Sequence, residues 1–400
     1  MNIIIPREES EELEQKKYWC LVYGRRKVGK TFLLRNFCSF SKFYTVKKDS
    51  SIFSEGKNIS LSQLNEEVVA QLSKNNTLVI DEFQRLNQSI IEEWVTLHPK
   101  GRLILSGSSL RVIKKIFEPQ SPLLGFFVPL KIGFIKALTM LRGLKKNVKG
   151  SEILELAAFL REPWLIPLYE KGSSEQFVFD TLTKSKHTIS ALIGEIFTEE
   201  EREISKKYNA LLSLIGSGVW NTKELTSTMY SRNLIPDPSP THIQQYLKNL
   251  EEMELVDSIK IYNSKKNYYR LKSPMMNVYY YLNDRYDLDR EPSFEELKPT
   301  IQKLINLEVQ NFIADVFSEL IGGRKEYYVS KDKEIDFIIT KRNKIELVGE
   351  VKWKKIDSKD IERFKAQTKE FQGKRMIICK EGSIVDEEII VLDYVKLLAG

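Results

Sequence analysis

Cysteine and histidine are scarce in this 400-residue sequence, and their scarcity excludes several kinds of site. The three cysteines, Cys20, Cys38 and Cys379, are too far apart to form a zinc-binding spacing or a disulfide framework. Each lies in an apolar setting, so we expect buried free thiols in a reducing cytoplasm. The three histidines are scattered. A histidine-based metal site or a Ser-His-Asp triad is therefore not expected.

The sequence also lacks an apolar run of the ~18 to 20 residues that a helix needs to cross a bilayer, so no membrane partner is expected. Met1–Pro6 is too short for the apolar part of a secretory signal. The net charge of +7 suits a nucleic-acid partner, but a soluble protein with spare lysines would show it too. The length predicts two to four domains.

Residues 1–135 alternate apolar strand runs with amphipathic segments, which is the pattern of a parallel sheet with crossover helices. The strand candidates are Trp19–Tyr23, Lys42–Val46, Thr77–Ile80 and Arg102–Leu105. The periodicity then becomes helical, for example at Ile153–Arg161 and His187–Phe197. We therefore predict an α/β fold with a parallel sheet, followed by a helical lid at residues 136–200.

A glycine-rich segment of the form G-x-x-x-x-G-K-T directly follows the first strand candidate. Its glycines allow a tight turn in which backbone N–H groups converge on phosphate oxygens. Lys30 supplies a positive charge for the β- and γ-phosphates, and the Thr31 hydroxyl can ligate Mg²⁺. A surface Gly/Lys turn is the alternative, but a strand precedes the segment and a helix follows it. The predicted ATP-binding residues are Gly24, Arg25, Arg26, Lys27, Val28, Gly29, Lys30, Thr31 and Phe32.

Two further strand candidates end in polar residues. Thr77–Ile80 runs into Asp81 and Glu82, and the carboxyl end of a parallel strand is where ligands bind in open α/β sheets. We predict that Asp81 holds Mg²⁺ through water and that Glu82 polarises the attacking water. Ser106, after the next strand, can orient that water or contact the γ-phosphate. The alternatives are an ordinary solvated strand end and a simple Ser/Gly turn.

Four segments together resemble the archaeal ATPase family of the AAA+/STAND-like group. They are Arg7-Glu8 before an acidic helix, the phosphate loop, Asp81-Glu82 and Leu105–Ser109. The resemblance covers nearly the whole chain, because the order of the later domains is similar. It implies that Arg7 lies beside the nucleotide base.

One position departs from that family. The family often has an arginine after the segment that reads Ser121–Gly125 here, where this chain has Phe126. If that arginine assists catalysis, turnover is slow here, or Arg111 or an arginine of a partner takes its place. Loss of such an arginine costs ~10³-fold or more in rate.

Residues 201–285 are predicted to form a winged-helix domain, because three helical segments precede a β-hairpin. The segments are 208–215, 222–230 and 241–253, followed by strands at 256–262 and 268–271. The residues expected to contact double-stranded DNA are Gln244, Gln245, Lys248, Lys265, Lys266 and Arg270. A pure packing module is the alternative, because the third helix runs into acidic residues. Residues 278–289 are interpreted as a linker.

Residues 290–400 form a separate α/β unit with a helix at 301–320, strands at 334–339, 345–353 and 375–379, and a helix at 359–371. Glu350 and Lys352 are two residues apart, so they share one face of their strand. With Asp336 on the preceding strand, they could bind Mg²⁺ and stabilise a phosphodiester transition state. Glu308 falls on the apolar stripe of its helix, which is costly unless the carboxylate is paired.

These residues resemble the restriction-endonuclease-like PD-(D/E)xK superfamily, as found at the C-terminus of the archaeal ATPases. The resemblance implies that Asp336 and Glu350 ligate metal, that Lys352 positions water or phosphate, and that Glu308 is an accessory ligand supported by Gln367. A solvated hairpin edge is the alternative.

The geometry sets a condition on this site. A plain two-residue turn at Arg342–Asn343 puts Asp336 and Glu350 on opposite faces, so a longer loop or a bulge is required.

Two functions remain open from the sequence. In the first, ATP and Mg²⁺ control a DNA-binding protein whose C-terminal domain cleaves DNA. In the second, ATP controls assembly of a regulatory switch, and a catalytically inactive C-terminal domain binds a partner. Either function is compatible with a homo-oligomer.

Overall fold

The computed structural model describes residues 3–15, 17–97, 100–200, 202–382 and 384–399. The chain divides into two compact units. The smaller unit contains residues 6–134 and 192–203, and the larger unit contains residues 1–5, 135–191 and 204–400. Among the described helices, none is both long enough and apolar enough for a membrane span.

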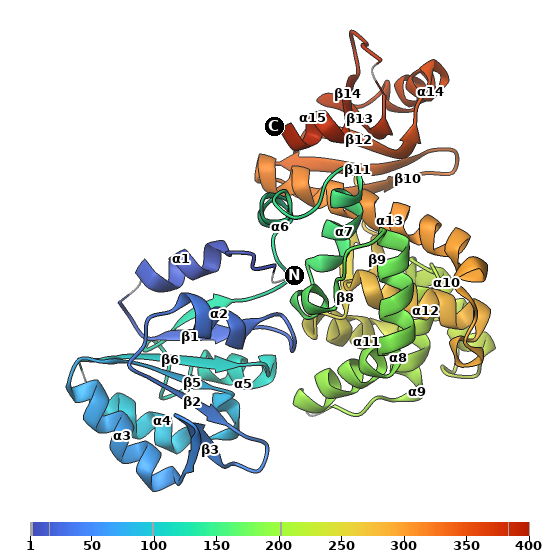
Figure 1. Cartoon of the computed structure of the whole chain (residues 1–400). Helices are drawn as coiled ribbons and strands as arrows, with labels where there is room; N and C mark the ends of the chain where they lie inside the picture. The colour runs from blue at the N-terminus through green and yellow to red at the C-terminus, as the bar shows by residue number, and fades with distance from the viewer. Residues whose placement is uncertain (1–2, 16, 98–99, 201, 383, 400) are drawn as a thin grey trace. The chain divides into compact units, whose positions relative to one another are not determined.

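A seven-stranded sheet of order β4-β3-β2-β5-β6-β1-β7 forms the centre of the smaller unit (Figure 1). From β2 to β7 all neighbouring strands are parallel, while β3 and β4 add an antiparallel edge. The four predicted strands are confirmed, and β3, β4 and β7 are additional. The strands are β1 Cys20–Tyr23, β2 Lys42–Val46, β3 Ile52–Ser54, β4 Lys57–Ile59, β5 Thr77–Asp81, β6 Arg102–Gly107 and β7 Val128–Lys131.

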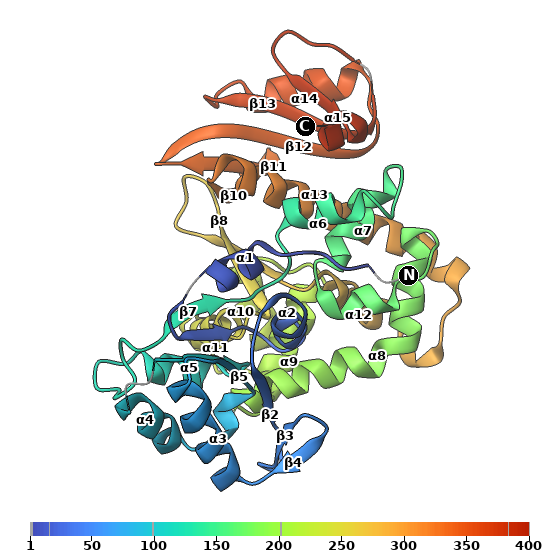
Figure 2. The ribbon, with the colours of Figure 1, turned by 60° about the vertical axis from the view of Figure 1, so that its left-hand side comes forward.

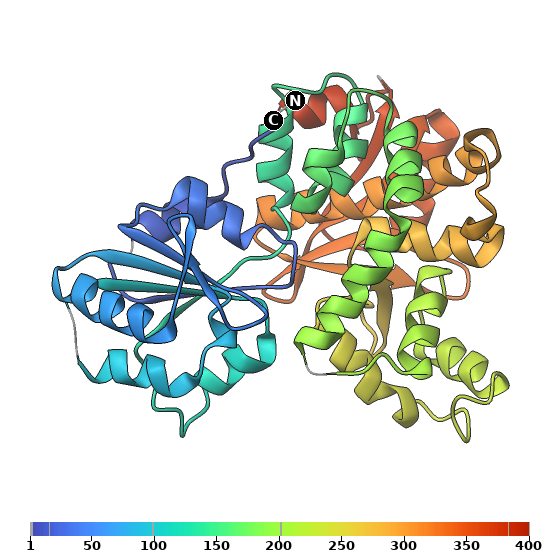
Figure 3. The ribbon, with the colours of Figure 1, turned by 60° about the horizontal axis from the view of Figure 1, so that its bottom comes forward.

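Helices cover both faces of this sheet, so its central strands are apolar on both sides. On one face α1 (Glu8–Gln15) and α2 (Lys30–Phe37) pack in a core that contains Leu13, Leu33 and Leu34. On the other face the core contains Leu64, Trp94 and Ile113. They come from α3 (Leu61–Ser73), α4 (Gln88–Thr96) and α5 (Leu110–Ile116), and Figure 3 shows the two layers. A short helix, η1 (Phe83–Arg85), follows β5.

The helical segment after the sheet is confirmed. It contains α6 (Ala137–Leu144), α7 (Glu152–Leu160), η2 (Pro163–Leu168) and α8 (Ser174–Glu199). Residues Ile153 to Leu160 of α7 are all buried, and the one charged residue among them, Glu155, makes an ion pair with Lys380. The 26-residue helix α8 is continuous and contributes residues to both units.

The predicted three helices and hairpin are also present. They are α9 (Lys206–Gly216), α10 (Thr222–Ser231), α11 (Thr241–Glu252), β8 (Val256–Lys260) and β9 (Asn267–Leu271), and the two strands pair antiparallel. The linker expected at residues 278–289 was wrong, because α12 (Pro274–Tyr286) occupies most of it. Ser273 caps this helix by accepting from Met276 N, and Pro274 stands at its first position, where the missing N–H costs nothing.

The C-terminal part of the larger unit is a five-stranded sheet of order β10-β11-β12-β13-β14. Helix α13 lies on one face of it, where Phe317 stacks on Phe337, and α14 covers the other face (Figure 2). The predicted strands and helices are confirmed, and β10, β14, η3 and α15 are additional. The elements are η3 Leu288–Arg290, α13 Phe294–Ile321, β10 Arg324–Val329, β11 Glu334–Lys341, β12 Lys344–Lys355, α14 Ser358–Thr368, β13 Lys374–Glu381, β14 Ile390–Asp393 and α15 Tyr394–Ala399.

Candidate functional site

The segment between β1 and α2 has the backbone of an anion-binding loop. Lys27 (φ 66°) and Gly29 (φ 88°) are left-handed, and alternation of this kind turns successive N–H groups toward one point. Gly24 (φ 153°) permits a close approach, because a Cβ there would lie 1.9 Å from the Ile132 carbonyl oxygen. Gly29 is also the N-cap of α2, so the positive end of that helix faces the loop.

Lys30 places its ammonium group inside this loop. Its Nζ donates to the carbonyl oxygens of Gly24 (2.8 Å) and Arg25 (3.1 Å), and the residue is buried. Burial lowers the pKa of Lys30, while the negative charges of Glu82, Glu199 and Asp81 oppose this shift. A buried cation among backbone N–H groups is suited to a polyphosphate, which would supply the missing negative charge.

Three predicted residues meet where the central strands end. The Thr31 hydroxyl donates to Asp81 Oδ2 at 2.7 Å, which joins the loop to the last residue of β5. Ser106 on β6 is in register with Val22 of β1 and with Asp81 of β5, so it lies between the two motifs. Its Oγ is fully buried and has no hydrogen-bond partner among the described residues. An orphaned buried hydroxyl is rare, and a ligand at this position would satisfy it.

This donor set fits a nucleoside triphosphate with Mg²⁺, because hydroxyl and carboxylate oxygens are the ligands that Mg²⁺ prefers. Glu82 is close by, in left-handed backbone (φ 60°). It pairs with Arg85 at 2.8 Å and accepts from Gln84 Nε2 at 2.9 Å. These two contacts hold the carboxylate beside the site in a defined orientation. Burial raises the pKa of Glu82, and the charge of Arg85 opposes this shift.

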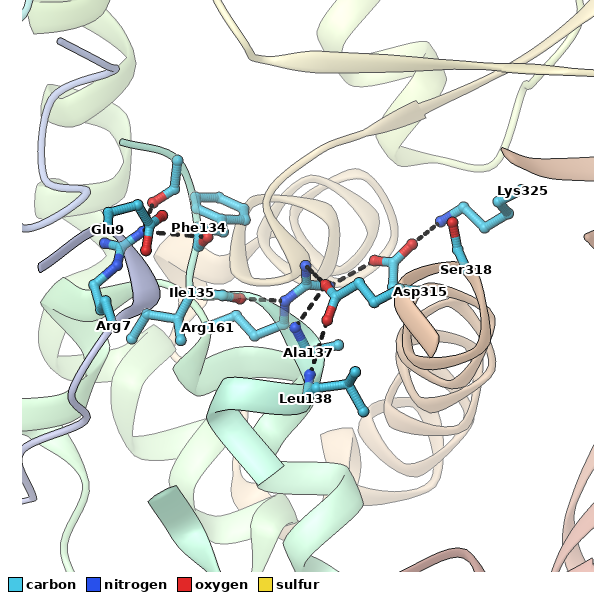
Figure 4. Close-up of polar contacts among 12 residues, drawn as sticks. Arg7, Glu9, Phe134, Ile135, Ala137, Leu138, Arg161, Asp315, Ser318 and Lys325 are labelled. Carbon is cyan, nitrogen blue, oxygen red and sulfur yellow. Dashed lines mark hydrogen bonds and ion pairs between the residues drawn. The ribbon is translucent and has the colours of Figure 1, made fainter. Parts of the chain in front are cut away.

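Arg7 joins the phosphate loop to the segment that follows β7 through hydrogen bonds to backbone carbonyl groups. Its guanidinium donates to the carbonyl oxygens of Val28 (2.9 Å) and Gly133 (2.9 Å) and pairs with Glu9 (3.1 Å), and Figure 4 draws its contacts near Phe134. The loop is thereby tied to the segment after β7. The contact of Arg7 with a nucleotide base, implied by the family resemblance, stays a prediction.

The remaining loop residues have different surroundings. The Val28 side chain lies in the core, so it can offer a nucleotide only its backbone. Arg25 is buried with its guanidinium 4.9 Å from the centroid of the Phe134 ring. Phe32, in the first turn of α2, is exposed. Arg26 makes ion pairs with Glu195 and Glu199, two residues that the sequence did not indicate because they are far away in the chain.

The larger unit has a second polar cluster, on the hairpin β11–β12. The turn has two residues, Arg342 (φ 51°) and Asn343 (φ 62°), both left-handed. A register shift then follows between the pairs Ile339–Leu347 and Thr340–Ile345, so β12 carries one extra residue. Phe337 is therefore opposite Gly349, and continuing this register sets Asp336 opposite Glu350. The bulge required by the sequence argument is present.

Asp336 and Glu350 influence each other strongly. Burial and the charge of Glu350 raise the pKa of Asp336 to about 7, although Val351 N donates to its carboxylate at 2.7 Å. Glu350 makes an ion pair with Lys352, and its Oε2 is buried without a hydrogen-bond partner among the described residues. Gln367 Oε1 on α14 is likewise buried and unsatisfied in the described part of the chain. The structure thus brings together Asp336, Glu350 and Lys352, which the sequence argument allowed only with a longer loop or a bulge.

Glu308 and Arg270 do not belong to these sites, and both predictions are corrected. Arg270 was expected to contact DNA and Glu308 to ligate metal. Instead they form a buried ion pair (2.6 Å), and Asn277 Nδ2 donates to Glu308 at 2.9 Å. Burial would lower the pKa of Arg270, but the charge of Glu308 raises it. The stripe of α13 therefore carries a carboxylate because a buried arginine neutralises it.

The other predicted DNA residues are exposed. Gln244, Gln245 and Lys248 lie on α11, and Lys265 and Lys266 lie in the turn between β8 and β9. Among the described residues, no three His, Cys, Asp or Glu side chains are grouped as a metal site requires. Any Mg²⁺ at Asp336 and Glu350 would therefore need further ligands from water or a substrate.

The hairpin β8–β9 also has a contact that sequence reasoning missed. Tyr268 stacks on Trp220 and lies 4.7 Å, between ring centroids, from Tyr327 of β10. Ile261 forms a β-bridge with Tyr327, and Tyr262 N donates to the Tyr327 carbonyl oxygen. Tyr268 and Tyr262 of the hairpin segment thus contribute to packing on the C-terminal sheet.

Comparison with known families agrees with the geometry of the smaller unit. Residues 16–128 match the family described as AAA domain. This segment is similar to AAA domains. It contains the anion-binding loop, Asp81, Glu82 and Ser106, and it ends at the first residue of β7. A search of curated proteins found no match to the chain.

Several solved structures share a loose similarity with the chain. The ORC2 protein of Aeropyrum pernix, in its ADPNP and ADP complexes, is 15% identical with a TM-score of 0.40, over 78% of this chain and 97% of that one. A STAND protein with a tetratricopeptide repeat sensor from Pyrococcus horikoshii is 12% identical with a TM-score of 0.30, over 80% of this chain and 50% of that one. Cdc6p of Pyrobaculum aerophilum is 12% identical with a TM-score of 0.26, over 75% and 91%.

Proposed function

We propose that this chain is a Mg²⁺-dependent ATPase of the AAA+ type whose nucleotide cycle controls binding to double-stranded DNA. The observation that carries the ATPase assignment is the meeting of Thr31, Asp81 and Ser106 around a buried Lys30. These groups come from three separate segments, and each has the chemistry that a metal-bound triphosphate requires.

Each residue has a distinct part in this proposal. Lys30 and the N–H groups of the loop bind the β- and γ-phosphates, and Thr31 and Asp81 hold Mg²⁺. When bound, Mg²⁺ neutralises phosphate charge that develops during transfer. Glu82 orients and deprotonates the attacking water, and Arg85 keeps its carboxylate in place. The Ser106 hydroxyl donates to the γ-phosphate or to that water.

A direct experiment measures ATP binding and Mg²⁺-dependent phosphate release by the full chain. Lys30→Ala should abolish both, because the loop would lose its buried cation. Lys17→Ala, an exposed lysine ahead of β1, is a matched control and should behave like the wild type. Unchanged hydrolysis in Lys30→Ala, or no nucleotide binding by the wild type, would refute the assignment.

The proposal places the DNA interface on residues 201–285, as a winged-helix domain between the lid at 136–200 and the domain at 290–400. Its support is the order of α9, α10, α11, β8 and β9, together with the exposed Lys248, Lys265 and Lys266. Amide side chains on α11 suit base edges, and the lysines suit the phosphate backbone. Assembly of several copies around DNA is part of the same proposal.

A second activity, Mg²⁺-dependent DNA cleavage by residues 290–400, is favoured by one observation. The bulge in β12 sets Asp336 and Glu350 on one face of the hairpin, with Lys352 paired to Glu350. Cleavage of duplex DNA that requires Mg²⁺ and is lost in Asp336→Ala would support a nuclease. ATP-dependent assembly without cleavage would support the alternative, a regulatory switch whose C-terminal domain binds a partner.

A further inference from the structure

The third residue of the phosphate loop is bound by two carboxylates from a distant helix. Arg26 Nε lies 2.6 Å from Glu195 Oε2, and its other guanidinium nitrogen Nη1 lies 2.6 Å from Glu199 Oε1. Burial would lower the pKa of Arg26, but the hydrogen bond and charge of Glu199, with Glu195, raise it. The guanidinium therefore makes two ion pairs, although it belongs to a loop built to bind phosphate and its buried Nε makes no hydrogen bond among the described residues.

The carboxylates come from the last turns of α8. Residues 192–199 of this helix belong to the smaller unit, and Leu192, Ile193, Ile196 and Phe197 are buried. The next residue, Glu200, accepts hydrogen bonds from Leu110 N (2.7 Å) and Arg111 N (3.1 Å) at the start of α5. The end of α8 is therefore attached both to the phosphate loop and to the helix that follows Ser106.

Glu199 also acts on the lysine of the loop. Burial lowers the pKa of Lys30, and the negative charges of Glu82 and then Glu199 oppose this change. A triphosphate in the loop would bring several negative charges to the same place. The phosphates and the carboxylates would repel each other at short range. Arginine, unlike lysine, can bind two phosphate oxygens at once. Phosphate and the α8 carboxylates thus compete for one guanidinium.

We propose that Arg26 exchanges Glu195 and Glu199 for the phosphates of a bound nucleoside triphosphate, and that this exchange releases the end of α8. The inference deepens the proposed ATPase function and depends on it. Arg26 then supplies positive charge to the terminal phosphate, and α8 reports which nucleotide is bound. Because α8 is one continuous helix that contributes to both units, its release is a route from the nucleotide to the larger unit.

After this exchange, Glu195 and Glu199 would still be hydrated or paired. Glu195 is 37% exposed and Glu199 is 16% exposed, so water can hydrate them once Arg26 leaves. Lys48 lies 3.6 Å from Glu195 and remains a partner. A diphosphate lacks the terminal phosphate that would complete the exchange, so it should leave the ion pairs largely in place.

The test measures the binding of a non-hydrolysable ATP analogue and of ADP by calorimetry, with Mg²⁺. The double variant Glu195→Gln/Glu199→Gln removes the competing charges while it keeps side-chain size and helix propensity. It should bind the ATP analogue about tenfold or more tightly than the wild type, with a much smaller gain for ADP. Arg26→Ala should lose most of the preference for the ATP analogue over ADP. The exposed Glu203→Gln is a control for the loss of a single carboxylate near the end of α8 and should match the wild type.

Hydrogen exchange gives a second readout that a purely structural ion pair would not produce. In the wild type, the ATP analogue should speed exchange of amides in residues 192–199, whereas ADP should not. In the double variant these amides should exchange rapidly without nucleotide.

The inference and the proposed function fail in different ways. If the wild type binds the ATP analogue and Lys30→Ala does not, the proposed function stands. In that case the inference is overturned if the double variant binds the analogue and ADP as the wild type does. It is also overturned if Arg26→Ala keeps the wild-type preference for the analogue over ADP. Exchange in residues 192–199 that ignores the analogue also overturns it. If the wild type binds neither nucleotide, the function and the inference fall together.

Discussion

The Thr31 hydroxyl donates a hydrogen bond of 2.7 Å to the carboxylate of Asp81. Thr31 stands in the first turn of α2 and Asp81 ends β5, two strands away from β1 in the sheet order. If Thr31 and Asp81 hold Mg²⁺ as proposed, this bond sets the spacing of their oxygens in advance, and less reorganisation would be needed to bind the metal. Arg7 supports the same arrangement through the carbonyl oxygen of Val28.

Thr31→Ala should reduce Mg²⁺-dependent ATP hydrolysis by roughly 10²- to 10³-fold, which corresponds to about 3–4 kcal/mol. The variant loses both the hydroxyl ligand and the bond that orients Asp81. Thr31→Ser retains the hydroxyl and should stay within about fivefold of the wild type. Rates measured over a range of Mg²⁺ concentrations check this. Equal activity of the alanine and serine variants would show that the hydroxyl does not ligate the metal.

Ser106→Ala should lower ATP hydrolysis without lowering thermal stability. Its Oγ is buried and lacks a partner among the described residues, so removing it relieves a desolvation cost of about 1–3 kcal/mol. Ser109→Ala is the opposite control, because the Ser109 hydroxyl accepts from Val112 N at the N-cap of α5 and its loss should cost about 0.5–2 kcal/mol. Thermal unfolding and steady-state hydrolysis of both variants separate the two roles. A large loss of stability in Ser106→Ala would contradict the proposal.

The local order of the chain allowed much of the smaller unit to be predicted. A strand, a glycine-rich turn and a helix are adjacent in sequence, so the positions of Gly24 and Lys30 follow from local chemistry. Ser106 was found because parallel strands end at the same edge of a sheet. The partners of Arg26 could not be found, because Glu195 and Glu199 reach the loop only through tertiary folding and show no periodicity that differs from an exposed helix face.

Arg270→Ala should unfold the larger unit more readily, with a loss of roughly 3–5 kcal/mol, because Glu308 would be left as a buried uncompensated charge. Arg270→Met combined with Glu308→Gln should recover much of this loss, since Gln keeps an acceptor for Asn277 and no charge remains. Thermal and urea unfolding measure both variants. A stable Arg270→Ala variant that has lost DNA affinity would instead identify Arg270 as a surface contact.

Lys265→Ala and Lys266→Ala should leave stability within about 0.5 kcal/mol of the wild type, because both side chains are exposed. If the hairpin turn contacts phosphates, each variant should lower the affinity for duplex DNA and reduce the slope of log K against log salt by about 1. Fluorescence anisotropy at several salt concentrations checks this. An unchanged slope in both variants would remove the turn from the DNA interface.

Asp336 should make stability fall as the pH rises. The unfolded carboxyl group ionises near ~3.9, whereas the folded pKa is about 7. The contribution is therefore fully present below the unfolded value and is lost as the pH rises through the folded value. Asp336→Asn cannot ionise, so at pH 8 it should melt at least about 2 °C above the wild type, and by only about a third as much at pH 5, which is about one unit above the unfolded pKa.

The measurement is made with a chelator, so that no divalent ion stabilises the carboxylate. Asp332→Asn is the control, because Asp332 is exposed and lies just ahead of β11. A wild-type melting temperature that does not change relative to Asp336→Asn between pH 5 and pH 8 would show that the Asp336 carboxyl group is hydrated.

The larger unit shows where sequence patterns are ambiguous. Glu308 on an apolar stripe correctly indicated a buried, paired carboxylate, but the partners considered were a metal site and Lys352, and only the fold identifies Arg270. The interpretation of the segment at 278–289 as a linker was wrong. The cap at Ser273 and the proline after it begin a helix there, and burial of Val278 and Leu282 maintains it.

The register of one hairpin, rather than any single side chain, decides whether Asp336 and Glu350 share a face. The pairing jumps from Ile345 to Leu347, so Glu346 is the surplus residue on β12. If Glu346 were paired instead of bulged, the register would slip by one residue and turn Glu350 and Lys352 to the far side of the sheet together. A slipped hairpin would thus keep every acid and lysine in its sequence and still lose the arrangement, whereas deletion of Glu346 would leave Asp336 opposite Glu350.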